Sequence, residues 1–89
     1  MHITIKYFAS LREALGVEQE LAVAPPEVLD IADLRRWLAL RGGVWEERFG
    51  PESAQAAHLR QAFGQQMCDQ QQALEEGCEV AFFPPVTGG

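Results

Sequence analysis

The chain has 89 residues and a formal net charge of −6, from seven basic and thirteen acidic side chains. That length suits one domain with a modest core, and 47% hydrophobic against 22% charged residues excludes wholesale disorder. The charge disfavours nucleic acid and anionic membranes as partners and favours a basic protein surface. Because no apolar run could span a bilayer and no signal peptide is recognisable, we expect a cytoplasmic protein.

The cysteines and histidines do not have the spacing of a metal site. Cys68 and Cys78 form no CxxC pair, so we expect two free thiols and no bound metal. His2 and His58 have no companion ligands in the sequence and are expected to be solvated.

A strand and a short helix are predicted first. Ile3, Ile5 and Tyr7 alternate with more polar residues, as in a strand with one buried face. Ser10–Glu13 has the Ser-x-x-Glu spacing of a capping box, which predicts a short helix that stops at Gly16.

A second strand is predicted at Leu21–Val23 and is ended by two prolines, so the first two strands should form a wide hairpin. The main helix is predicted over residues 31–41, with Asp30 as its N-cap and apolar residues at helical spacing. Arg41 would close this helix and complement its dipole. The helix is expected to cross the sheet.

The second half of the chain is predicted to be mostly strands. Residues 44–58 are interpreted as loop with a helical turn or two. Leu59–Phe63 and a short piece around Met67–Cys68 predict a third strand with a turn at Gly64, and Cys78–Phe83 is a strong final strand.

Strand parity places two aromatic rings on the polar side of their strands. Phe8 shares its side with Thr4 and Lys6, and Phe83 shares its side with Glu79. If the first and last strands run parallel and adjacent, both rings stand near the strand ends from which the tail departs, which suggests a docking patch. The alternative is that residues 44–58 fold over the rings and bury them.

The chain closes on a tail whose composition suits a reactive terminus. Pro84 and Pro85 end the last strand and stiffen the exit from it. Gly88 and Gly89 have no side chains and could pass through a channel too narrow for other residues. A frayed, inert terminus is the alternative interpretation of the same residues.

The closing string EVAFFPPVTGG, the opening segment Tyr7–Glu13 and the turn at Gly77 resemble the small sulfur-carrier subunit of molybdopterin synthase. The resemblance covers nearly the whole chain and is weakest over residues 44–58. It implies an α+β, ubiquitin-like β-grasp fold, with a mixed sheet of four to five strands crossed by one main helix. The expected organisation is a β-grasp domain over residues 1–83 and a flexible, reactive tail over residues 84–89.

The resemblance also implies a chemistry. Gly89, threaded with Gly88 into a partner, would be adenylated and then converted to a thiocarboxylate that donates sulfur to a pterin precursor. The chain has no GxxxxGK[ST] loop, so a partner adenylating enzyme would consume the ATP, and this chain would bind no cofactor itself. It would not be catalytic alone, but would be the sulfur-donating subunit of a heteromeric sulfurtransferase.

The partners implied are the large synthase subunit and the adenylating enzyme. Residues expected at these interfaces are Phe8, Phe83, Met67, Arg12, Pro84, Pro85, Val86 and Thr87. For Arg12, a solvated helix residue is an equal alternative.

One departure from the family pattern lies in Ala62–Met67, where members often carry an Asn-containing turn; Gly64 could supply the same backbone conformation.

Three other functions remain open: a carrier for thiamine or transfer-RNA thiolation, a protein modifier conjugated through Gly89, and a plain β-grasp interaction module with an inert tail.

Overall fold

The computed structural model describes residues 1–85. Its elements, in chain order, are β1 (His2–Tyr7), α1 (Ala9–Leu15), β2 (Gln19–Val23), α2 (Ile31–Ala39), α3 (Val44–Phe49), the 3-10 turn η1 (Ala56–His58), β3 (Arg60–Phe63), β4 (Gln66–Cys68) and β5 (Cys78–Phe83).

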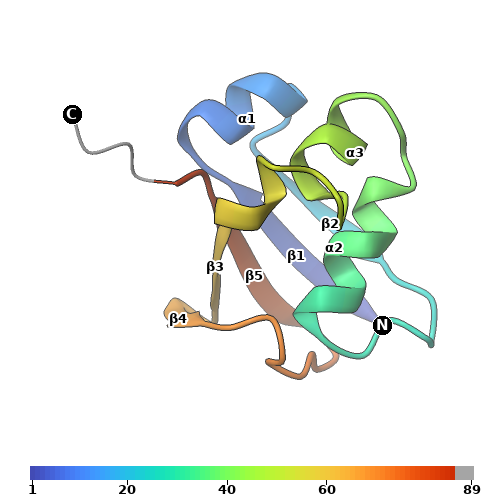
Figure 1. Ribbon diagram of the computed structural model, residues 1–89. Coiled ribbons are helices and arrows are strands. Elements are labelled where there is room, and N and C mark those ends of the chain that lie inside the picture. The colour runs from blue at the N-terminus through green and yellow to red at the C-terminus, as the bar shows by residue number, and fades with distance from the viewer. Residues whose placement is uncertain (86–89) are drawn as a thin grey trace.

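The five strands form one mixed sheet in the order β2-β1-β5-β3-β4. β1 and β2 pair antiparallel, which confirms the predicted hairpin. β1 and β5, the first and last strands, pair in parallel at the centre of the sheet, with Tyr7 opposite Phe82. Both strands therefore end at the same edge, close to α1 and to the start of the segment that follows β5 (Figure 1). This is the expected β-grasp arrangement.

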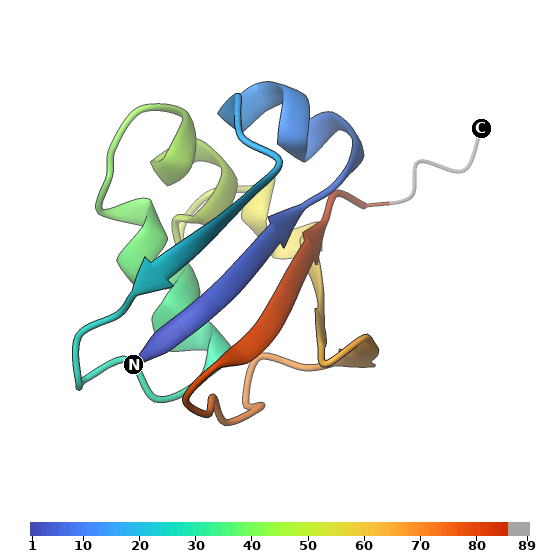
Figure 2. The same ribbon diagram turned by 180° about the vertical axis from the view of Figure 1, so that it is seen from behind.

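The helices lie on one side of the sheet. α2 and α3 stand in front of the strands in Figure 1, and Figure 2 looks onto the opposite face, which none of the described helices covers. The predicted stripe of Ile31, Leu34 and Leu38 is fully buried against the inner face, where it meets Ile5 and Phe82. One hydrophobic core therefore lies between the sheet and α2.

The start of the main helix is confirmed, but its predicted end is wrong. The Asp30 side chain accepts a hydrogen bond from the Asp33 backbone N–H at 2.8 Å, which caps the helix. The helix ends at Ala39 rather than at residue 41. Arg41 therefore lies beyond the helix, where its guanidinium is drawn into tertiary contacts instead of complementing the helix dipole.

Arg41 ties the end of α2 to the edge strand β2. Its two terminal nitrogens donate to the two carboxylate oxygens of Glu20, at 2.9 and 2.7 Å, and its guanidinium lies 4.3 Å from the centre of the Trp45 ring. The Tyr7 hydroxyl donates to the same carboxylate at 2.9 Å. The hydrogen bond from Arg41 lowers the pKa of Glu20, while burial raises the pKa of Tyr7 above its ordinary range.

The predicted capping box before the first helix is wrong. α1 begins at Ala9, so Ser10 is already inside the helix, and the N-cap Phe8 makes no side-chain cap. The backbone turns so sharply after β1 that Ala9 has a φ of 52°, which is costly for a residue with a Cβ. The predicted stop at Gly16 is confirmed, with a φ of 73°.

The loop with a helical turn or two predicted over residues 44–58 is confirmed. α3 and η1 lie within this segment, and Phe49 at the end of α3 is fully buried.

The turn predicted at Gly64 is confirmed: Gly64 and Gln65 both have positive φ, as this type of two-residue hairpin turn requires. The Asn-containing turn is therefore replaced without loss of the β3–β4 pairing.

Leu34→Ala should lower the free energy of unfolding by about 2 to 5 kcal/mol, because Leu34 is fully buried and the change leaves a cavity. Leu40→Ala is the matched control, since Leu40 follows α2 and is 82% exposed. It should change stability by less than about 0.5 kcal/mol. Urea denaturation measures both, and equal losses would contradict the assignment of the core.

Glu20→Gln should destabilise the protein at pH 7, because the neutral amide cannot form the charged pair with Arg41. Folding lowers the pKa of Glu20 below its unfolded value of about 4.3. The carboxylate therefore stabilises the native state fully at pH values above the unfolded pKa. This stabilisation is lost as the pH falls through the folded pKa. The stability difference between wild type and variant should therefore shrink below about pH 4. Thermal denaturation from pH 3 to 7 measures it; a constant difference would contradict the charged pair.

Candidate functional site

Phe8 and Phe83 stand together on the uncovered face, at the edge where β1 and β5 end. Their rings stack with centroids 4.9 Å apart and planes 12° from parallel. The Phe8 backbone N–H donates to the Phe82 carbonyl at 3.2 Å, which extends the parallel ladder by one residue and sets the register of the two rings. Phe8 is 39% exposed and Phe83 is half-buried.

The segment 44–58 does not cover these rings, so the alternative of a buried aromatic pair is wrong. α3 packs on the other side of the sheet, where Phe49 meets Phe82 with ring centroids 5.1 Å apart. The two adjacent residues of β5 therefore have opposite environments: Phe82 is fully buried, and Phe83 lies on the outer face.

A row of apolar residues continues the outer face from the aromatic pair toward β4. Ala62 is paired with Ala81 on one side and with Met67 on the other, and paired residues share a face. Met67 is 59% exposed. Phe8, Phe83, Ala81, Ala62 and Met67 together make up the outer apolar patch. The structure thus brings three predicted contact residues onto one face: Phe8 directly after β1, Phe83 on β5 and Met67 on β4.

The tail begins beside this patch. Pro84 and Pro85 follow β5 directly and line an open depression of about 430 Å³ with residues of α1, α3 and η1. The other predicted tail residues, Val86, Thr87, Gly88 and Gly89, lie outside the described residues.

Arg12 lies on α1, and its side chain pairs with an acidic residue rather than with the outer apolar patch. Its guanidinium is 4.0 Å from the Glu18 carboxylate, and both side chains are largely exposed. Its backbone N–H donates to the Phe8 carbonyl at 3.3 Å, across the first turn of the helix. The contact predicted for Arg12 with a partner stays a prediction.

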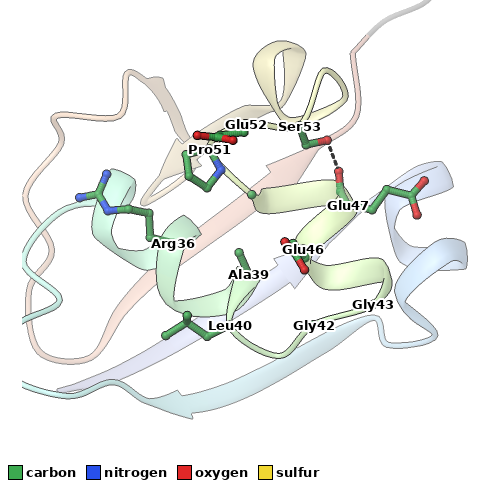
Figure 3. Close-up of a pocket in the computed structure, with 11 residues that line it drawn as sticks. Arg36, Ala39, Leu40, Gly42, Gly43, Glu46, Glu47, Pro51, Glu52 and Ser53 are labelled. Atoms are coloured by element: carbon green, nitrogen blue, oxygen red, sulfur yellow. Dashed lines mark hydrogen bonds between the residues drawn. The ribbon is translucent and has the colours of Figure 1, made fainter.

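A larger depression lies elsewhere, between α2, the start of α3 and the loop after α3 (Figure 3). It measures about 830 Å³ and contains Glu46, Glu47 and Glu52 with Arg36. Figure 3 shows these side chains spread around the opening, and the hydrogen bond drawn there joins the Ser53 hydroxyl to the Glu47 carbonyl. No nucleophile and base meet in it among the described residues.

Within residues 1–85, no group of three or more His, Cys, Asp or Glu is placed to hold a metal ion. Of the helices in the described part of the chain, none is long and apolar enough to cross a membrane. Burial raises the pKa of the Cys68 thiol, which opposes its use as a nucleophilic thiolate.

A model of the ThiS family matches residues 5–89. The chain belongs to the ThiS family. Among curated proteins, this ThiS-family chain is similar to the molybdopterin synthase sulfur carrier subunits of Haemophilus influenzae and Escherichia coli. It is 32% and 34% identical to them, over 98% of this chain and 99% of each relative. These relatives confirm the resemblance read from the closing string.

Solved structures confirm the β-grasp fold of this ThiS-family member. SAMP1 from Haloferax volcanii superposes with a TM-score of 0.79 at 26% identity, with both chains covered completely. The Helicobacter pylori complex of subunits 1 and 2 of molybdopterin-converting factor contains a chain that superposes with a TM-score of 0.65 at 22% identity. That chain and this one cover each other completely, and the likeness concerns the fold.

Sequence reasoning missed part of the outer face. Leu21 and Val23 of β2 are paired with Thr4 and His2 and are 67% and 65% exposed, so they lie on the same uncovered face. The alternation of β2 would not have indicated this, because larger apolar residues that share one side of a strand are expected on its buried face. Ala62 carries no signal either, because its closeness to Ala81 depends on the pairing of β3 with β5.

Phe83→Ala and Phe82→Ala form a matched pair of neighbours on β5. Phe83→Ala should cost about 2 kcal/mol or less, from the lost stacking and partial burial of its ring. Phe82→Ala should cost about 3 to 5 kcal/mol, because its ring is fully buried. Chemical denaturation of both variants measures this, and similar losses would show that Phe83 belongs to the core.

Proposed function

We propose that this chain is a sulfur carrier in molybdenum cofactor biosynthesis, acting as the small subunit of a molybdopterin synthase. The observation that carries the proposal is the near full-length similarity to two curated proteins of that name. The outer apolar patch beside the start of the tail supports it, because a carrier must present its terminus and its docking surface to the same partner.

The reactive group of the proposal is the carboxylate of Gly89. A carboxylate resists nucleophilic attack, so a partner enzyme would first join one of its oxygens to the α-phosphorus of ATP and release pyrophosphate. The sulfur of a persulfide would then attack the acyl carbon and displace AMP. Cleavage of the resulting S–S bond by a thiol leaves a thiocarboxylate on Gly89 and a disulfide on the donor side.

In the synthase, the thiocarboxylate sulfur would form a bond to a carbon of the pterin precursor as an oxygen leaving group departs from that carbon. Water would then hydrolyse the acyl–sulfur bond, which leaves the sulfur on the pterin and the carboxylate on Gly89. Two such transfers would supply the two sulfurs of a dithiolene. The protein itself contributes the sulfur and a docking surface. Phe8, Phe83 and Met67 would contact the large subunit, and Pro84 and Pro85 would hold the tail away from the sheet.

The remaining tail residues have proposed roles inside the partner. Val86 and Thr87 would contact the walls of its tunnel, while Gly88 would let the chain pass its narrowest part. ATP and persulfides are cytoplasmic reagents, so we place the protein in the cytoplasm.

A protein modifier would share the fold and the activation step. The solved Haloferax volcanii relative belongs to the small archaeal modifier proteins, but this chain is 26% identical to it and 32% and 34% identical to the two sulfur carriers. Carriers for thiamine or transfer-RNA thiolation would also share the activation step. The acceptor of the Gly89 acyl group or its sulfur distinguishes these functions.

Incubation with ATP, the adenylating enzyme of the same organism and a sulfur donor should replace one oxygen of Gly89 by sulfur. Mass spectrometry of the intact chain and its C-terminal peptide should show a gain of about 16 Da, the mass difference between the two atoms. Addition of the large subunit and pterin precursor should return the tail to the carboxylate.

A variant with one residue added after Gly89 is the control and should remain unmodified. If the tail of the parent chain stayed unchanged while the enzyme was active on another carrier, the carrier and modifier functions would both be ruled out. The chain would then be a binding module. A thiocarboxylate that persists with pterin precursor, or a tail found linked to lysine, would instead place the chain among the other carriers or the modifiers.

A further inference from the structure

Two of the seven basic side chains differ from the rest in their surroundings. Four of the others lie within 4.0 Å of a carboxylate. A fifth, Arg35, is buried and donates to the Ala56 carbonyl and to the Gln61 side-chain oxygen. The remaining two are Arg48 and Arg60, and neither has a carboxylate within 4.0 Å among residues 1–85.

Both arginines lie where the tail begins. Arg48, on α3, lines the depression of about 430 Å³ with Pro84 and Pro85. Arg60 opens β3, is paired with Phe83 across the sheet, and lines a neighbouring depression of about 370 Å³ with Pro85. The two arginines therefore lie at the start of the tail, in neighbouring depressions that share Pro85.

Arg48 has one guanidinium nitrogen, Nε, without a hydrogen bond among residues 1–85. This nitrogen is shielded from solvent and has no hydrogen-bond acceptor in the part of the chain that the structure describes. A partner would meet the terminal nitrogens of Arg48, which are not among the shielded atoms, and a guanidinium binds a carboxylate best because it can form two parallel hydrogen bonds with it.

We propose that Arg48 and Arg60 form a cationic docking site for aspartate and glutamate side chains at the mouth of the partner site that receives the tail. The inference rests on the proposed function and adds the chemistry of one contact to it. The chain as a whole carries a charge of −6, so this site reverses the local sign of the charge where the tail begins. An acidic rim on the partner would be repelled by most of this protein and attracted here, which fixes the orientation of docking.

The site acts in docking and takes no part in sulfur chemistry. Four residues separate Pro85 from the end of Gly89, and four extended residues span up to about 14 Å. When the tail is threaded into a partner, the arginines stay at the entrance while the thiocarboxylate lies deep inside. Arg48 and Arg60 are therefore positioning residues.

The test is the affinity of the full chain for the purified large subunit, measured by calorimetry at 50, 150 and 300 mM NaCl. Arg60→Gln should weaken binding about five-fold at the lowest salt and flatten the salt dependence, because one ion pair with the partner is lost. Arg48→Gln should act in the same direction, and Arg60→Lys, which keeps the charge, should restore most of the affinity.

Arg36→Gln is the matched control, since Arg36 is an exposed arginine on α2 whose ion pair is with Asp33 of the same helix. It should bind as the parent chain does. Thermal denaturation of each variant separates a loss of binding from a loss of fold, and the substitution at exposed Arg60 carries the conclusion if Arg48→Gln unfolds.

Equal affinities for Arg60→Gln and Arg36→Gln would overturn the cationic site while leaving the proposed function intact, provided that Gly89 still acquires sulfur. Tighter binding by Arg60→Gln would also overturn it, because the arginine would then hold the chain's own tail back. Absence of sulfur on Gly89 together with absence of binding by the parent chain would overturn both the proposed function and this inference.

Discussion

The parallel pairing of the first and last strands is the constraint on which the other features depend. β1 enters the centre of the sheet at the start of the chain, and β5 is laid beside it at the end. Because the two strands point the same way, the turn into α1 and the exit into the tail lie at one edge. The same register stacks Phe8 on Phe83, so the tail starts beside an aromatic pair.

The sheet separates stability from recognition by giving one face to each. On the inner face, Phe82 and the buried stripe of α2 form the core that determines whether the domain folds. On the outer face, small residues such as Ala62 and Ala81 pack tightly and leave larger side chains at the margins exposed. Substitutions on the outer face can therefore alter the exposed apolar surface while the fold persists.

The charged side chains also fall into two groups, one that stabilises the fold and one that lies beside the tail. Glu20 and Arg41 hold the edge strand to the end of the main helix through a two-point ion pair near Tyr7. Arg48 and Arg60 lie where the tail begins, and neither has a carboxylate within 4.0 Å among residues 1–85. In the proposed carrier, the first pair stabilises the scaffold and the second directs the terminus into its partner.

Local patterns in the sequence determined the strands β1 and β5, the N-cap and buried stripe of α2, and the turn at Gly64, because each depends on residues close together in the chain. The closing string likewise determined the family. Only the tertiary structure decided that the first helix has no capping box and that Arg41 lies beyond the main helix and binds Glu20. It also decided that α3 packs on the same side of the sheet as α2. It likewise decided that Arg48 and Arg60, twelve positions apart, lie at the same proline, because the sheet order that joins β3 to β5 depends on long-range contacts that no local pattern encodes.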